Sequence, residues 1–297
     1  MSRRGGMALV GVALAAATLV ACERPSQGDA ESGNTAQPIE SPAAAAVRQP
    51  GELAPLQPLP PLPPGPLGES IQRGRAIMLA TAESLPDHVG NSLRCTSCHL
   101  DEGRRQDAIP WTGVYARFPQ YRSRSGAVIT MEDRVNGCML RSMNGKALPD
   151  GSQAMRDMVA YMSYLSTGIA VGETVPGRGT PALDPLEPDT ARGRELYALR
   201  CVTCHGVNGE GTVNATPLWG DRSYNIGAGM ARLRTAAAFI HANMPYGDAT
   251  LTPQQAYDVA AYVNSHARPD LPGKENDWPN GDAPPDAAYP TRAQQGR

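Results

Sequence analysis

Lysine is almost missing from this chain. Of its 27 basic residues only Lys146 and Lys274 are lysines, and arginine supplies the rest. The formal net charge is −2, so no excess of positive charge indicates binding to nucleic acid. Aromatic residues make up only 5% of the chain, a small supply for an ordinary hydrophobic core. The preference for arginine has two explanations, a bias in genomic base composition or the recognition of anions.

The six cysteines do not form a disulfide framework: four of them lie in two C-x-x-C-H motifs at 95–99 and 201–205, Cys22 lies at the end of the amino-terminal apolar run described below, and Cys138 stands alone. In such a motif both thiols bind the vinyl groups of a haem, and the histidine binds the iron as proximal ligand. A zinc site is the alternative, but zinc-binding pairs usually lie about 15–20 residues apart. These pairs begin 106 residues apart. We therefore predict two covalently attached haem c groups, which also makes the low aromatic content less informative. The predicted attachment residues are Cys95, Cys98, Cys201 and Cys204, and the predicted proximal ligands are His99 and His205.

A sulfur-bearing residue follows each motif at the same distance. Cys138 lies 39 residues after His99, and Met244 lies 39 residues after His205. This repeat predicts the distal ligands of the two irons. A thiolate stabilises ferric iron and lowers the reduction potential, whereas a thioether favours ferrous iron and raises it. We therefore expect two unequal irons.

Other residues compete for both distal positions. Met139 or Met143 is the alternative at the first iron, with Cys138 then buried as an inert core residue. Met230 is the alternative at the second iron, 25 residues after His205. Met244 is favoured because it precedes a proline, which fixes the local backbone.

The amino terminus is typical of a bacterial signal peptide. Arg3 and Arg4 precede an apolar or small run at 7–20, which is too short to cross a bilayer and fits the apolar region of a signal sequence. The run ends in Leu-Val-Ala-Cys22, which resembles a lipobox and implies cleavage after residue 21 and acylation of Cys22. An ordinary signal peptide with an incidental cysteine is the alternative. We expect a periplasmic protein that is anchored to a membrane by lipid.

The remaining chain divides by composition. A Pro/Ala-rich linker at 22–68 is expected to be extended, and a Gly/Pro-rich connector at 169–186 separates two similar halves at 69–168 and 187–268. A Pro-rich tail follows at 269–297, and the sequence does not decide whether it packs on the halves.

Each half has the same order: an opening helix, the haem motif, a loop with the distal ligand, and a closing amphipathic helix. The closing helices are expected at 152–165 and 252–266, with the Met residues of the first packed in the core. Asp189 is the expected N-cap of the second opening helix, and Pro253 follows the start of the second closing helix. The fold predicted is mostly α, with two class I cytochrome c-like domains that each enclose one haem.

The segment around Cys138 carries a more specific resemblance. The run Asp133-Arg-Val-Asn-Gly-Cys138-Met-Leu-Arg-Ser142-Met-Asn-Gly145, with Tyr121-Arg-Ser-Arg124 before it, resembles dihaem thiosulfate dehydrogenase. The Met-Pro pair at 244–245 agrees with it, and the similarity spans about 69–268.

This resemblance implies an enzyme that couples two thiosulfate ions into tetrathionate and releases two electrons, in some members reversibly. It implies that Cys138 engages the substrate sulfur and that Arg124, Arg134 and Ser142 line the pocket. In some members a lysine precedes the distal methionine; here Asn243 stands there, which favours simple His205/Met244 ligation. The expected partners are thiosulfate or tetrathionate, and an electron-accepting cytochrome c or other small redox carrier.

The substrate chemistry agrees with the arginine content. Residues 94–141 hold eight arginines, no lysine and five acids, and a guanidinium is a planar, permanently charged donor for oxyanions. Two other functions stay open: a dihaem electron carrier without a substrate, and a subunit of a larger sulfur-oxidising complex. A carrier needs neither a thiolate ligand nor an arginine pocket, so Cys138 favours the enzyme.

Overall fold

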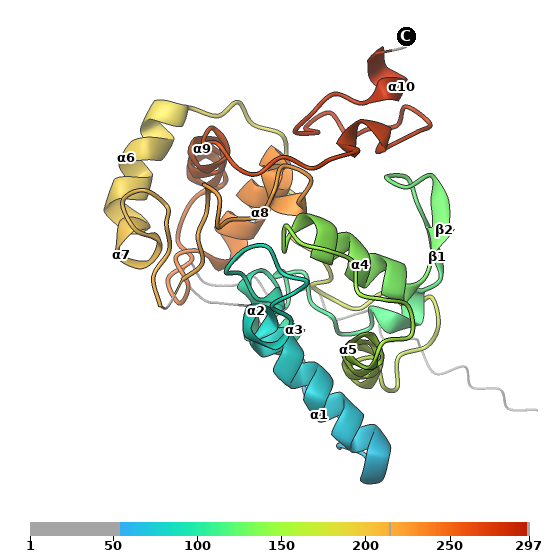
Figure 1. The fold of residues 1–297 in the computed structure, drawn as a ribbon. Helices are drawn as coiled ribbons and strands as arrows, with labels where there is room; N and C mark the ends of the chain where they lie inside the picture. The colour runs from blue at the N-terminus through green and yellow to red at the C-terminus, as the bar shows by residue number, and fades with distance from the viewer. Residues whose placement is uncertain (1–53, 214, 296–297) are drawn as a thin grey trace, which may run out of the picture. The chain divides into compact units, whose positions relative to one another are not determined.

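The computed structural model describes residues 54–213 and 215–295. The expected signal peptide at 1–21, Cys22 and the linker up to residue 53 lie outside the described residues. The described chain is mostly helical, as predicted, and its sheet is a two-stranded antiparallel hairpin (Figure 1). In chain order the elements are α1 (Gly65–Leu79), α2 (Thr81–Ser84), α3 (Leu100–Gly103), β1 (Gln120–Arg122), β2 (Ala127–Ile129), α4 (Met131–Arg141), α5 (Gln153–Tyr164), α6 (Thr190–Arg200), α7 (Val202–His205), α8 (Leu233–Asn243), α9 (Pro253–Asn264) and α10 (Arg292–Gln295).

In each half the opening helix crosses the closing helix at a glycine. A Cβ atom at Gly74 of α1 would lie 1.9 Å from the carbonyl oxygen of Asp157 in α5. A Cβ atom at Gly193 of α6 would lie 2.0 Å from the carbonyl oxygen of Asp258 in α9. Both crossings therefore bring two backbones into direct contact, which only the absence of a side chain permits.

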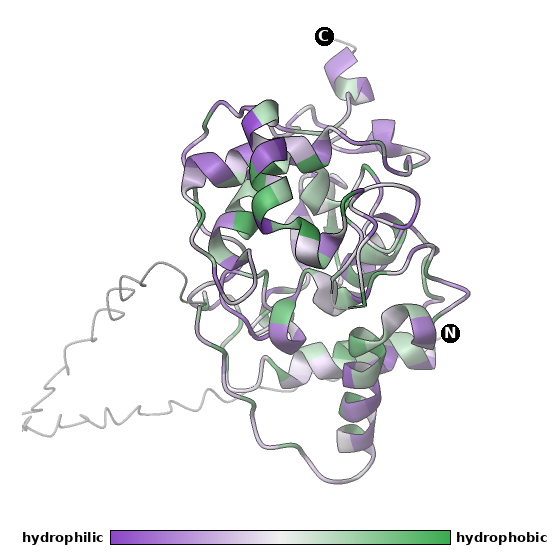
Figure 2. Cartoon of the chain, turned by 90° about the vertical axis from the view of Figure 1, so that its left-hand side faces the viewer, coloured by the Kyte–Doolittle hydropathy of each residue, from purple (hydrophilic) through white to green (hydrophobic). Residues whose placement is uncertain are grey.

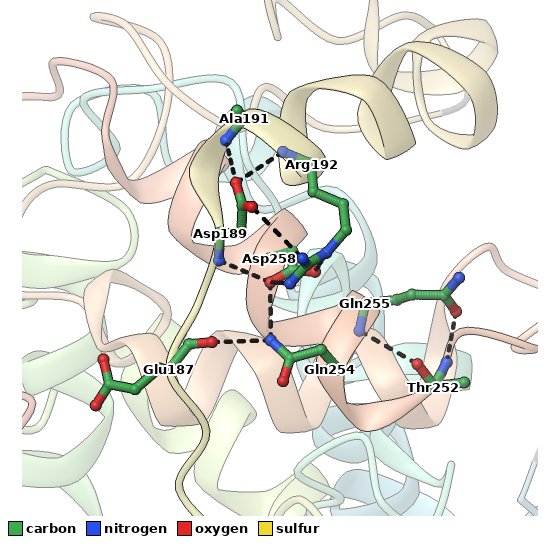
Figure 3. Close-up of polar contacts among 8 residues, drawn as sticks. All are labelled: Glu187, Asp189, Ala191, Arg192, Thr252, Gln254, Gln255 and Asp258. Atoms are coloured by element: carbon green, nitrogen blue, oxygen red, sulfur yellow. Dashed lines mark hydrogen bonds and ion pairs between the residues drawn. The ribbon is translucent and has the colours of Figure 1, made fainter.

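A buried aspartate fixes each crossing beside its glycine. Arg73 binds Asp157 in the first half, and Arg192 binds Asp258 in the second (Figure 3). Figure 3 also shows that the Asp258 carboxylate accepts from the backbone N–H of Asp189 at 2.8 Å and from Gln254 at 3.0 Å. The Asp258 side chain is fully buried, so these donors replace the water it has lost.

The local caps of these helices follow the expected residues. Asp189 accepts from the backbone N–H groups of Ala191 and Arg192 and so caps α6 as predicted. Thr252 and Gln255 form a reciprocal capping box at the start of α9 (Figure 3). Helix α9 ends at Asn264, two residues before the expected end, and its last turn is closed by Ser265.

Replacing Asp258 with Asn should lower the free energy of unfolding by about 2 kcal/mol, because charged hydrogen bonds become neutral ones in a buried place. Burial raises the pKa of the Asp258 carboxyl, but the bonds from Arg192, Asp189 and Gln254 outweigh it and hold the pKa below its ordinary value of 3.8. The charged form therefore stabilises the fold above about pH 4, and this contribution is lost as the pH falls through the lower folded-state pKa. Urea unfolding at pH 7 and pH 3 measures both effects. The two proteins should differ less at pH 3, and an equal difference at both pH values would contradict the explanation.

The methionines of α5 pack in the core of the first half, as predicted. Met155, Met158 and Met162 are at most 6% exposed and lie with Trp111 and Tyr161 in one hydrophobic cluster. Figure 2 shows hydrophilic and hydrophobic residues interleaved along the same helices, the pattern of amphipathic elements that bury one side. No helix among the described residues is both long and apolar enough to span a membrane.

The segments flanking the halves differ in part from the expectation. Helix α1 begins at Gly65, inside the stretch assigned to the linker, with Pro66 in its first turn. The backbone N–H of Gln57 donates to the carbonyl oxygen of Arg104 at 3.0 Å. The backbone N–H of Gln106 donates to the carbonyl oxygen of Pro55 at 3.3 Å. The segment just before α1 therefore lies against the first half and does not extend away from it.

Candidate functional site

Helix α4 presents Cys138 one turn after Arg134. The helix starts at a capping box in which Thr130 accepts from the backbone N–H of Asp133 at 3.3 Å and Asp133 accepts from that of Thr130 at 2.9 Å. This cap fixes the first turn, and residues four apart lie on the same helix face. Arg134 Nη1 lies 2.8 Å from Cys138 Sγ. The sequence therefore places a guanidinium directly against the thiol.

The surroundings of the Cys138 thiol favour its anionic form. Burial opposes ionisation, but the charge of Arg134 and a hydrogen bond with the His99 ring outweigh it and lower the pKa of Cys138 to about 6. The charge of Cys138 also acts on Cys95 and Cys98. The two attachment cysteines, His99 and Cys138 therefore converge on one place, as the sequence predicted for the first haem. Met139 and Met143, the alternative ligands, lie in the hydrophobic core.

Both histidines that are predicted as proximal ligands are oriented in the same way. His99 Nδ1 lies 2.5 Å from the carbonyl oxygen of Ile109, and His205 Nδ1 lies 2.9 Å from that of Thr216. A ring whose Nδ1–H donates to a carbonyl leaves Nε2 with a free electron pair for iron. The donor set of each half thus fits an axial haem ligand.

A cavity in the second half brings together most of the groups predicted to hold the second haem, but Cys204, the other predicted attachment residue, is exposed and does not line it. It is lined by Cys201, His205 and Met244, and otherwise mainly by apolar side chains. Met230 also lines it, so the cavity brings both candidate distal ligands together and does not choose between them. Cys98 of the first motif lies in the wall of the same cavity. The two attachment sites are therefore close neighbours, which suits electron transfer between them.

Replacing Met244 with Leu should remove the thioether from the second iron, while Met230→Leu should leave the coordination unchanged. Leucine keeps the volume of methionine, so packing changes little. The far-red absorption band of ferric iron with a methionine ligand should disappear in the first variant, and the reduction potential of one haem should fall. The reverse pattern would assign the ligand to Met230.

The loop with Met244 is bonded to the loop that follows His99. Asn243 Nδ2 donates to the carbonyl oxygen of Asp107 at 3.0 Å, and Tyr246 Oη donates to Asp101 Oδ1 at 2.7 Å. Asn243 is fully buried. Asn243, which precedes Met244, therefore forms a contact between the two halves.

Four arginines without carboxylate partners lie near one another around Arg122, and two of them, Arg134 and Arg122, interact with Cys138. Burial lowers the pKa of Arg122, the neighbouring charges of Arg134, Arg178 and Arg117 lower it further, and Cys138 raises it. Within 54–213 and 215–295, none of these four arginines forms an ion pair with a carboxylate. Such a concentration of unpaired positive charge is costly unless an anion binds there.

The other two expected pocket residues have different surroundings. Ser142 is the C-cap of α4 and lies one turn after Cys138. Its carbonyl oxygen accepts from Asn91 Nδ2 at 2.9 Å. Arg124 donates to the carbonyl oxygen of Gly227 at 2.6 Å and lies 3.7 Å from the carboxylate of Asp277. The structure thus brings Arg134 to the thiol and binds Arg124 to residues of other segments.

Sequence reasoning missed Arg122 and the two buried aspartates. Arg122 lies two residues before Arg124 in the run that was singled out, and only the structure shows its coupling to Cys138. Asp157 and Asp258 each precede a tyrosine by four residues, Tyr161 and Tyr262, so an internal repeat could have revealed them.

Comparison with protein families finds two matches. Residues 87–171 match the SoxA/TsdA cytochrome c domain, and residues 190–267 match the cytochrome c family. Together they cover both halves, and they indicate two covalently attached c-type haems in two cytochrome c domains. The prediction of fold and cofactor is confirmed.

Similarity to curated proteins identifies the family more specifically than the two domain matches do. The chain is 48% identical over 215 residues to a thiosulfate dehydrogenase of Allochromatium vinosum, covering 68% of this chain and 80% of the relative. It is 44% identical over 227 residues to a thiosulfate dehydrogenase of Psychrobacter arcticus, covering 74% of this chain and 69% of that one. Among solved structures, the thiosulfate dehydrogenase TsdBA of Marichromatium purpuratum in its as-isolated form matches with a TM-score of 0.70 and 43% identity. That match covers 72% of this chain and 50% of the solved chain.

Proposed function

The chain belongs to the thiosulfate dehydrogenase family, and from this premise we propose that Cys138 and the arginines beside it form the place where thiosulfate reacts. The protein is a dihaem enzyme that oxidises thiosulfate. The observation that carries the proposed site is the contact of Arg134 with Cys138, inside a group of arginines that have no carboxylate partners.

The proposed reaction joins two thiosulfate dianions through one new sulfur–sulfur bond. The product is tetrathionate, a dianion, and two electrons leave. When bound, the two haems supply two one-electron acceptors, which matches this number. We propose that an external carrier, a cytochrome c or another small redox carrier, removes the electrons.

The residues of the chain have separate tasks in this proposal. Arg134 holds the Cys138 sulfur as an anion, the form in which sulfur is both an iron ligand and a nucleophile. Arg117, Arg122 and Arg178 offset the four negative charges of two substrate ions, which otherwise repel each other. Without this compensation the two ions could not come close enough to form a bond.

Arg124 and Ser142 complete the proposed pocket, as the family resemblance implies. Ser142 follows Cys138 by one helical turn, so both can face the same space. Arg124 lies two residues after Arg122, and its bonds to Gly227 and Asp277 hold it in the wall of the site.

A steady-state assay of the holoprotein with thiosulfate and an artificial one-electron acceptor tests the function. Tetrathionate should form with two acceptor molecules reduced for each tetrathionate. The reverse assay, with tetrathionate and a reduced dye, measures whether the enzyme also runs backwards. Acceptor reduction by the isolated chain excludes a role that requires sulfur bound to a carrier protein. No turnover with free thiosulfate would contradict the proposal.

We also propose the domain organisation and location predicted from the sequence. The signal peptide ends at residue 21, Cys22 carries lipid, and a linker leads to cytochrome c domains at about 69–168 and 187–268. A haem-bearing protein of this kind then works in the periplasm, attached to a membrane. Mass spectrometry of the mature amino terminus tests the anchor, because an unmodified or uncleaved terminus is incompatible with it.

A further inference from the structure

The tail after the second domain contacts the first domain at Arg124 and Arg141, and Arg141 follows Cys138 by three residues on α4. The model of the cytochrome c family ends at residue 267, so this tail lies outside both matched domains. In Figure 1 the tail, coloured red, passes close to the β1–β2 hairpin. The backbone N–H of Trp278 donates to the carbonyl oxygen of Arg124 at 2.8 Å, and the Trp278 ring lies 4.4 Å from the Arg124 guanidinium.

Asp277 joins the two elements that border the proposed site. Its Oδ1 accepts from Arg141 Nη2 at 2.7 Å, and Arg141 belongs to α4 three residues after Cys138. Its Oδ2 lies 3.7 Å from Arg124 Nη1, in the loop that follows Arg122. One carboxylate therefore connects the helix that carries Cys138 with the hairpin that carries Arg122.

The carboxylate itself is held firmly. Asp277 is 8% exposed, and Tyr289, 6% exposed, donates its hydroxyl to Asp277 Oδ2 at 2.6 Å. Burial and this bond raise the pKa of Tyr289 to about 12, so the hydroxyl keeps its proton at neutral pH. A network of buried charged hydrogen bonds of this kind is rigid, because any displacement leaves a buried group unpaired.

A second contact attaches the tail to the second domain. Arg232 donates to Asp286 at 2.6 Å and 3.0 Å, and the backbone N–H of Arg234 donates to the other oxygen at 2.9 Å. This ion pair resembles that of Asp277 in chemistry, but its partners lie at the start of α8 and not beside Cys138. It provides a matched control.

We propose that the carboxy-terminal tail forms part of the thiosulfate site and that Asp277 is a positioning residue, which sets the distance between Cys138 on α4 and the arginines of the β1–β2 hairpin. This inference rests on the proposed function of Cys138. Asp277 acts through Arg141 and Arg124 and does not touch the substrate. Because a small displacement of a binding group weakens its contact strongly, the tail should govern the affinity for thiosulfate.

The test compares Asp277→Asn with Asp286→Asn, since each removes one carboxylate charge of the tail, Asp277 from Arg141 and Arg124 and Asp286 from Arg232. Asp277→Asn should raise the KM for thiosulfate about tenfold and weaken thiosulfate binding in calorimetry to the same degree, with kcat changed less than threefold. Asp286→Asn should change neither KM nor binding by more than twofold. Both variants should retain two haems and the wild-type absorption spectrum.

Tyr289→Phe is the second variant, because it removes one bond to Asp277 and leaves all charges in place. It should raise KM about threefold. Equal effects of Asp277→Asn and Asp286→Asn, or a lower KM in Asp277→Asn, would overturn the positioning role, since either result indicates a general effect of charge or stability. A wild-type holoprotein that neither binds nor oxidises thiosulfate would instead overturn the proposed function.

Discussion

Replacing Cys138 with Met should reduce kcat/KM for thiosulfate by about 10³-fold or more, while both haems remain attached. The thioether can still bind iron but lacks the negative charge and the nucleophilic character of the thiolate. Removal of a residue that bonds to the reacting atom has effects of this size in other enzymes. Initial rates with thiosulfate and an artificial acceptor measure the loss.

The same variant separates the enzyme from a simple electron carrier. A carrier with methionine at its first iron should still pass electrons from a chemical reductant to an oxidised acceptor. The reduction potential of the first haem should rise, because thioether favours ferrous iron. Met139→Leu is the control, since it conserves volume at the neighbouring core position and should keep most of the activity. Full thiosulfate turnover by Cys138→Met would contradict the proposed catalytic role of Cys138.

Replacing Gly193 with Ala should prevent the second domain from folding correctly, with a cost of about 3–5 kcal/mol or more. The new Cβ would lie 2.0 Å from the carbonyl oxygen of Asp258, and this atom belongs to the backbone of a packed helix. A flexible side chain could turn away, but here α6 and α9 must separate. Separation would also weaken the bonds between Arg192 and Asp258.

Haem content and thermal unfolding measure this effect. We expect a protein with one haem per chain, or a much lower midpoint of unfolding for the second domain. Gly229→Ala is the control, because no atom lies within 4 Å of its added Cβ. Gly74→Ala should have the corresponding effect on the first domain, where the contact is 1.9 Å. Wild-type stability in Gly193→Ala would show that the helices can move apart at little cost.

Much of this fold follows from patterns that are local in the sequence. The haem motifs, the cap at Asp189 and the start of α9 depend on residues within one or two turns, and the structure confirms the caps. The repeated spacing from His99 to Cys138 predicted that the two residues share one site, and the structure has the Cys138 thiol in a hydrogen bond with the His99 ring, while their binding to iron stays a prediction. Local chemistry and spacing are enough for such features.

The contacts between distant segments did not follow from the sequence. Asp277 and Arg141 are 136 residues apart, and nothing in their neighbouring residues indicates the pairing. The tail was left undecided because its polar, proline-rich composition is typical of irregular segments, yet Trp278 and Tyr289 bury most of their surface. The proline-rich segment before α1 was expected to be extended, and nothing in its composition indicated that its first described residues pair with the segment after α3.

The position of Arg124 illustrates the same limit at the site. The motif indicated an arginine near Cys138, and the structure provides Arg134 and Arg122 there. The motif does not show which distant residues Arg124 contacts, and in the structure Arg124 donates to Gly227 and lies near Asp277. Motif spacing identifies a segment, whereas side-chain direction depends on what the segment packs against.

Electron paramagnetic resonance of the fully oxidised holoprotein tests the central claim most directly. Two low-spin ferric signals of equal intensity should be present, one with the narrow spread of g-values that thiolate coordination produces and one typical of histidine–methionine coordination. The narrow signal should be missing in Cys138→Met. Two identical signals, or a thiolate signal that survives this substitution, would contradict the account.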